Sequence, residues 1–216
     1  MNQSTVRLWL LADGVEDARA GASRKGRASS EAPKRDAQLR RKPVIFSGLQ
    51  LVVDFGPRYL CEHGVQVCGL DLSSELVERA RQLNPDIKFE QGNMFALNAA
   101  DATWAGIVAF YSIIHIPRTD HVPVFSEMRR VLRSGGLLLL AFHVGDEVVH
   151  FDELWGQAVS LDFHLFCADA VVLALRRAGF EVEKIVERDP YPNVEAQTRR
   201  GYILASKRSE KGFSGG

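Results

Sequence analysis

Short apolar runs and amphipathic stretches alternate along most of the chain. Runs rich in Val, Ile, Leu and Phe predict strands at 49–54, 65–70, 87–90, 104–114 and 136–142. Apolar positions with a helical period predict helices at 58–63, 74–83, 120–133 and 169–178. Strands that alternate with helices in this way indicate an α/β fold, in which helices cover both faces of a parallel sheet.

The C-terminal part of the domain departs from this alternation. Residues 180–187 and 201–207 predict two more strands, and no helical pattern lies between them. We therefore expect an antiparallel pair at one end of the sheet. Residues 145–165 have no clear period, and we expect them to be irregular.

Residues 1–42 differ in composition from the domain expected at 43–208. They contain ten Lys or Arg residues against five acidic ones, and Trp9 is their only aromatic residue. Such a segment buries too little apolar surface to offset its ordering entropy, so we expect a disordered basic leader. A basic arm that binds nucleic acid is the alternative, and residues 209–216 are expected to form a flexible tail.

The composition of the whole chain excludes several classes of protein. Lys plus Arg and Asp plus Glu both number 27 among 216 residues, so net charge does not indicate a nucleic-acid or acidic-membrane partner. No apolar run approaches the length needed to span a membrane. The three cysteines form no CxxC pair, which is typical of a reduced, cytoplasmic protein.

One carboxylate stands at a position of special interest. Asp71 directly follows the strand expected at 65–70, and Ser73 then opens the next helix. In open α/β sheets, ligands bind beyond the carboxyl ends of the strands, where a carboxylate can accept hydrogen bonds from both hydroxyls of a ribose. Asp71 could instead serve only to cap the following helix, and the residue by itself leaves both interpretations open.

Five segments together resemble the class I S-adenosylmethionine-dependent methyltransferases. These are VVDFG at 52–56, VQVCGLDLS at 65–73, QGNMFAL at 91–97, the apolar run at 104–114, and EMRRVLRSGGLLLLAF at 127–142. The resemblance implies S-adenosylmethionine as the cofactor. It also implies a Rossmann-like, doubly wound, mostly parallel sheet of seven strands, with an antiparallel C-terminal strand.

The resemblance also implies roles for residues in the nucleoside part of the site. Asp71 corresponds to the residue that binds the ribose hydroxyls, and Leu72 to the one that packs on the adenine. Asn93 corresponds to the contact with the adenine amino group and Met94 to a contact with the ring. Tyr111 corresponds to a position beside the cofactor.

The methionine part of the site departs from the family pattern. The resemblance places Asp54 and Gly56 near the methionine portion, but only one glycine remains of the usual GxGxG loop. Residues 55–64 also form a short connection for a parallel crossover. A degenerate, non-catalytic domain is therefore one alternative. An NAD-dependent oxidoreductase is another, less favoured because G-x-G-x-x-G is absent before the second strand.

The sequence offers candidates for the chemistry but does not identify the methyl acceptor, which we expect to be a small molecule. His115, just beyond the fourth strand, is the best-placed general base, and His143 after the fifth is a weaker candidate. A purely structural role for His115 is the alternative. Four aromatic residues could either roof an acceptor pocket or pack a cap: Phe151, Trp155, Phe163 and Phe166.

Overall fold

The computed structural model describes residues 44–47, 56–154, 156–193 and 195–208. The strands are β1 (Val44–Ser47), β2 (Val67–Asp71), β3 (Lys88–Gln91), β4 (Trp104–Phe110), β5 (Leu132–His143), β6 (Val148–Leu154), β7 (Gln157–His164), β8 (Phe180–Arg188) and β9 (Arg200–Lys207). The α-helices are α3 (Gly56–Glu62), α4 (Ser74–Leu83), α5 (His121–Val131) and α6 (Ala168–Arg177). Two short 3₁₀ helices, η2 (Ile113–His115) and η3 (Arg118–Asp120), precede α5.

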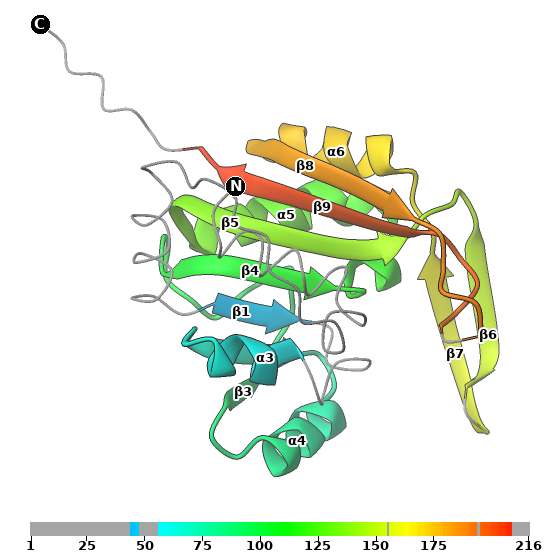
Figure 1. Cartoon of the computed structure of the whole chain (residues 1–216), viewed down its shortest axis with the longest axis horizontal. Helices are drawn as coiled ribbons and strands as arrows, with labels where there is room; N and C mark the ends of the chain where they lie inside the picture. Colours follow the sequence, from blue (N-terminus) through cyan, green and yellow to red (C-terminus); the bar gives the residue numbers. More distant parts are fainter. Residues whose placement is uncertain (1–43, 48–55, 155, 194, 209–216) are drawn as a thin grey trace, which may run out of the picture.

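Seven strands form one mixed sheet in the order β3-β2-β1-β4-β5-β9-β8. The pairings from β3 to β5 are parallel, whereas β9 runs antiparallel to both β5 and β8. The arrowheads of β1, β4 and β5 therefore point to the same edge of the sheet (Figure 1). The expectations of an α/β fold and of an antiparallel pair formed by the last two strands are confirmed.

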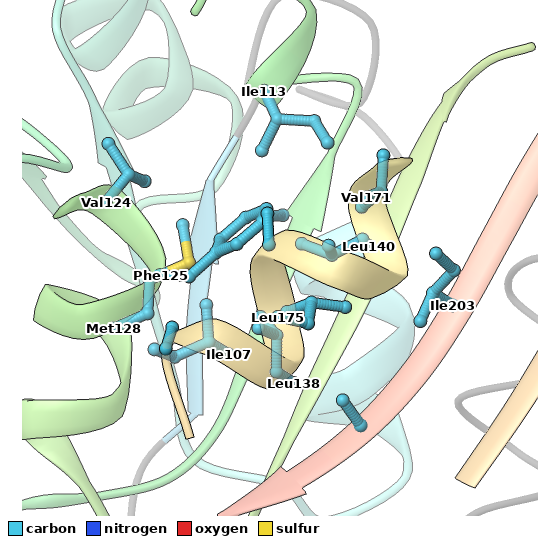
Figure 2. Close-up of a cluster of buried hydrophobic side chains, with 14 of the residues drawn as sticks. Ile107, Ile113, Val124, Phe125, Met128, Leu138, Leu140, Val171, Leu175 and Ile203 are labelled. Carbon is cyan, nitrogen blue, oxygen red and sulfur yellow. The ribbon is translucent and has the colours of Figure 1, made fainter. Parts of the chain in front are cut away.

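Side chains fill the core on both faces of the sheet. On one face, α5 and α6 pack against β4, β5 and β9, and this packing is shown in Figure 2. On the other face, Leu60 of α3 and Val77 of α4 pack near Leu137 and Leu139. The run of four leucines in β5 alternates between the two faces, which explains why no polar residue interrupts it. No helix in the described ranges is long and apolar enough to cross a membrane.

The first strand differs from the expectation. The strand expected at 49–54 lies outside the described residues, and Val44–Ser47 occupies the place between β2 and β4. The connection from β1 to β2 therefore spans 48–66 rather than 55–64. This connection is longer than the roughly dozen residues that a parallel crossover needs, so the argument from a short connection does not apply to β1 and β2.

The expectation that residues 145–165 are irregular is wrong. β6 and β7 pair antiparallel and form a two-stranded ribbon outside the main sheet. The ribbon lies beyond the edge toward which the parallel strands point (Figure 1). Its apolar and polar positions do alternate, but a β-bulge shifts the register between Phe151 and Glu153 and shortens the period that the sequence displays.

One histidine is enclosed in the core at the start of α5. His121 is 2% exposed, and its ring contacts the rings of Phe125 and Phe166. Its Nε2 has no hydrogen-bond partner among the described residues. Burial, the largest cause, lowers the pKa of His121 from 6.5 to about 4, because charging an enclosed ring is unfavourable.

We predict that His121 makes the protein sensitive to mild acid. A histidine with a lowered folded-state pKa costs nothing above its unfolded pKa of 6.5 and destabilises the fold as the pH falls toward 4. Replacing His121 with Leu should remove about 2 kcal/mol of the stability loss between about pH 7 and about pH 5. Urea denaturation of both proteins at each pH measures this. Equal pH dependence in the two proteins would contradict the prediction.

Candidate functional site

The carboxyl edge of the sheet brings together the nucleoside-site residues expected from the sequence. Asp71 ends β2 and is half-buried, and its Oδ1 accepts a hydrogen bond of 2.9 Å from the backbone N–H of Ser73. The Ser73 hydroxyl in turn caps α4 by accepting from the N–H of Leu76. Leu72 leaves 68% of its surface exposed, which provides an apolar face next to the carboxylate.

The loop after β3 lies against the same strand end. The N–H of Gly92 donates to the carbonyl of Asp71 at 2.8 Å, and the Gln91 amide donates to the carbonyl of Leu72. Asn93 is exposed, and its side-chain oxygen accepts from the N–H of Phe95. Met94 is half-buried against the core beneath α5 and α6. The contacts of Gln91 and Gly92 hold the loop that contains Asn93 and Met94 against the end of β2, where Asp71 and Leu72 lie.

Two further predicted residues follow β4. Tyr111 has a positive φ of 52°, and its N–H donates to the carbonyl of Ala141 on β5. This strained backbone turns the chain out of the strand. Burial is the main cause that raises the pKa of Tyr111, and the interaction with the nearby Tyr202 is the second. Tyr111 therefore keeps its phenolic proton.

His115 ends η2, four residues beyond Tyr111, and its ring meets the ring of Phe163 on β7 at 4.8 Å between centroids. Although the side chain reaches the surface, the protein around the ring desolvates it and lowers its pKa. This effect exceeds the opposing influences of a hydrogen bond with the backbone of Asp162 and, next, of the charge of Asp71. The residues expected on β2, the β3 loop and the exit of β4 thus lie at one edge.

The methionine half of the expected site is only partly described. Asp54 lies outside the described residues. Gly56 begins α3, at the start of the helix that crosses to β2. The residues that are described suit a nucleoside: a carboxylate at a strand end, an exposed leucine beside it and an amide on the adjoining loop. Among the described residues, no cluster of His, Cys, Asp or Glu could hold a metal ion.

Of the four aromatic residues expected around an acceptor, Phe151 and Phe163 lie on the ribbon, where they could line a pocket. Phe151 and Phe163 are half-buried and contact each other on the ribbon, with ring centroids 5.0 Å apart. Phe166 is instead fully buried and belongs to the core beneath α5 and α6. Trp155 lies outside the described residues.

A charged cluster at the same edge was missed by the sequence analysis. Arg188 ends β8 directly opposite Arg200, which begins β9. Glu195, from the connecting loop, accepts hydrogen bonds from both guanidinium groups, at 2.5 Å from Arg188 and 3.2 Å from Arg200. We call these three residues the Arg–Glu–Arg cluster. Two like charges that lie opposite each other on paired strands repel, so they need a carboxylate between them. Aligning the two strands of the hairpin in the sequence would have placed Arg188 opposite Arg200 and so indicated this need.

Arg200 is the most enclosed member of the Arg–Glu–Arg cluster. It is 3% exposed, and its Nη2 donates to the carbonyl of Ala196. Its Nη1 lies within hydrogen-bonding distance of the Thr198 hydroxyl, the Thr198 carbonyl and Nδ1 of His143, which share its two N–H groups. The hydrogen bond from Arg188 is the main cause that lowers the pKa of Glu195 to about 2. The loop between β8 and β9 is therefore fastened to the end of β5.

Comparisons with known proteins agree on one family. A family profile described as "Methyltransferase domain" matches residues 56–136. A sterol 24-C-methyltransferase from Gibberella zeae is 28% identical over 55% of this chain and 34% of its own length. A phosphatidylethanolamine N-methyltransferase from Cereibacter sphaeroides is 33% identical over 39% of this chain and 43% of its own length. The chain thus spans less than half the length of these curated relatives.

The solved structures agree in fold. A structure described as a S-adenosylmethionine-dependent methyltransferase from Methanosarcina mazei superposes with a TM-score of 0.68 and 16% identity. The superposition covers 78% of this chain and 93% of that one. These comparisons give no support to the alternative of a degenerate, non-catalytic domain.

We predict that Glu195 is required for stability in a way that an exposed carboxylate is not. Glu195→Gln leaves two arginines facing each other without a counter-charge and should lower the free energy of unfolding by about 2–3 kcal/mol. The matched control is Glu187→Gln, which breaks the pair with the more exposed Arg199 and should cost under about 0.5 kcal/mol.

Urea denaturation measures both variants. Because the pKa of Glu195 is lowered, its stabilising effect is present above pH 4.5 and is lost as the pH falls toward 2. The difference between the parent and Glu195→Gln should therefore narrow over that range. Equal stability of the two variants at neutral pH would show that the Arg–Glu–Arg cluster contributes nothing.

Proposed function

We propose that this chain, which belongs to the class I S-adenosylmethionine-dependent methyltransferases, transfers a methyl group to a small, largely apolar acceptor. S-adenosylmethionine is the cofactor of the family, and it supplies a methyl group already activated by the sulfonium. The observation that carries the proposal is that Asp71, Leu72, Asn93 and Met94 follow the ends of β2 and β3 at the carboxyl edge of the sheet. The ribbon of β6 and β7 lies beyond the same edge (Figure 1).

Four residues are suited to the nucleoside portion of the cofactor. The carboxylate of Asp71 stands at the end of β2, where its oxygens can accept hydrogen bonds from both ribose hydroxyls, since an ionised carboxylate has about four acceptor positions. The exposed face of Leu72 and the side chain of Met94 can pack on the adenine ring. The Asn93 amide can accept from the adenine amino group.

The ribbon supports an apolar acceptor. Its residues alternate between a half-buried face and an exposed face. On one face, the following half-buried side chains are all apolar: Val149, Phe151, Val159, Leu161 and Phe163. This face meets the site at η2, through the contact of Phe163 with His115. The two curated relatives are named for a sterol and a phospholipid substrate, which favours an apolar acceptor here too.

His115 is suited to accept a proton from the acceptor. Desolvation lowers its pKa, so the ring is neutral at pH 7 and can act as a base without first losing a proton. Its position next to Phe163 puts it between the nucleoside site and the apolar face of the ribbon. Alignment of the acceptor with the methyl group contributes the rest of the rate enhancement, because the methyl group needs no further activation.

We predict that Asp71→Asn weakens binding of S-adenosylhomocysteine about tenfold to hundredfold. The amide keeps the size of the side chain and an oxygen for Ser73, but it loses the negative charge that strengthens the ribose contacts by about 1.5–3 kcal/mol. Isothermal titration calorimetry measures the change.

Asp86→Asn is the matched control, because Asp86 pairs with Arg58 just before β3, at the opposite edge of the sheet. The control should bind as the parent does. If Asp71→Asn also binds as tightly as the parent, the ribose assignment is wrong.

We predict that His115→Gln lowers the rate of methyl transfer about a hundredfold or more, which is the usual contribution of a general base. The substrate is found by supplying radiolabelled S-adenosylmethionine with a panel of sterols, phospholipids and other apolar acceptors. His150→Gln, on the exposed face of the ribbon, should retain the parental rate.

The pH profile provides a second readout. The parental rate should hold at pH 7 and fall only at more acidic pH, once the pH drops below the lowered pKa of His115. If a folded His115→Gln variant loses less than about tenfold in rate, His115 is not the general base, and alignment alone accounts for catalysis.

A further inference from the structure

His143 lies where the ribbon joins the sheet. It is the last residue of β5, and its carbonyl accepts from the N–H of Phe166, which follows β7. Its ring stands beside Tyr111, with 5.0 Å between the centroids, at the exit of the neighbouring strand β4. The imidazole is thus at the carboxyl edge, where the central strands meet the ribbon whose apolar face we propose to bind the acceptor.

The contacts of His143 determine which ring nitrogen carries the proton. Nδ1 lies 2.5 Å from a guanidinium nitrogen of Arg200 and 2.6 Å from the hydroxyl of Thr198. Arg200 can only donate hydrogen bonds, so a proton on Nδ1 would face a second donor. The guanidinium of Arg200 therefore favours Nδ1 as the acceptor, which puts the proton of the neutral ring on Nε2.

The second nitrogen is available to a ligand. Within the described ranges, no hydrogen bond reaches Nε2 of His143, and the atom is not among the fully enclosed polar atoms. A donor N–H at the ligand edge of the sheet, backed by a buried cation, is suited to an oxygen with negative charge.

We propose that His143 donates a hydrogen bond from Nε2 to an oxygen of the methyl acceptor, and that this acceptor is an apolar molecule with a phenolic or enolic hydroxyl. The proposal rests on the proposed methyl transfer and names the substrate class of that site. His143 thereby contacts the substrate without removing its proton, and Arg200 is a positioning residue that fixes the tautomer.

The charges around His143 favour an anionic oxygen. Arg188 and Arg200 carry two positive charges against the single negative charge of Glu195, which leaves the Arg–Glu–Arg cluster with one net positive charge. Tyr111 stays neutral, because burial raises its pKa. Since Arg200 is almost fully buried, its charge is weakly screened, and it polarises the imidazole toward donation from Nε2.

The two histidines of the edge consequently differ in role. Burial, followed by the charge of Arg200, lowers the pKa of His143 to about 4 against the weaker opposing effect of Glu195. His143 therefore remains a neutral donor throughout the physiological range. His115 has no cation bound at its ring in the described structure, so one of its nitrogens can accept a proton.

Nitrogen-15 NMR of the histidine side chains tests the tautomer on the whole chain without any ligand. The signal of His143 is assigned by its absence from His143→Gln. We expect a proton on Nε2, none on Nδ1, and no titration from about pH 8 to about pH 5. A proton on Nδ1, or titration near pH 6.5, would overturn the proposal.

Binding of two probes tests the donor role. 2-Naphthol has the apolar body and acidic hydroxyl that the site should favour, and 2-methylnaphthalene has the same body without the hydroxyl. The parent should bind 2-naphthol about tenfold more tightly, as measured by fluorescence titration. His143→Leu should bind both alike, whereas His143→Gln, which retains an N–H donor, should recover part of the preference.

Equal binding of both probes by the parent, or a preference that survives in His143→Leu, would overturn the proposal. Thr198→Val provides a variant with Arg200 intact, and in it the proton should remain on Nε2. Titration with S-adenosylhomocysteine is performed separately. Its failure would contradict the proposed methyl transfer, whereas the tautomer and the probe preference are measured without the cofactor.

Discussion

Burial of β5 on both of its faces is the constraint on which the rest of the structure depends. Leu138 and Leu140 pack under α5 and α6, while Leu137 and Leu139 pack toward α3 and α4. A strand covered in this way must lie inside the sheet, with helices on either side. Its parallel pairing with β4 then aligns the carboxyl ends of neighbouring strands, and the polar residues that follow those strands meet at one edge.

The ribbon between β5 and α6 adds an apolar face to this edge, and we propose that the acceptor binds there. The ribbon of β6 and β7 cannot form a core of its own, because two strands bury too little surface. Its apolar face is therefore directed to the edge, where Phe163 meets His115. A backbone hydrogen bond from the N–H of Phe166 to the carbonyl of His143 joins the end of the ribbon to the sheet. Fold stability and the proposed substrate site thus share the same contacts.

The Arg–Glu–Arg cluster places one net positive charge at the same edge. Burying the guanidinium of Arg200 carries a high desolvation free energy, so each of its N–H groups needs a hydrogen-bond acceptor. These hydrogen bonds join the loop between β8 and β9 to the end of β5 and the start of β9. One neutral histidine is then held in a single tautomer next to an apolar wall, whereas the other histidine, His115, keeps a nitrogen able to accept a proton.

The sequence by itself determined the features that depend on short-range patterns. The periods of apolar residues predicted most strands and helices, and Asp71 with Ser73 was predicted at a strand end and helix cap because both roles depend on adjacent residues. Tertiary structure decided the rest. Residues 44–47 took the central strand position, the bulged ribbon concealed its alternation, and Arg188 met Arg200 only through a long-range hairpin register. Such pairings depend on which surfaces remain to be covered after the core forms, and local sequence carries little record of that.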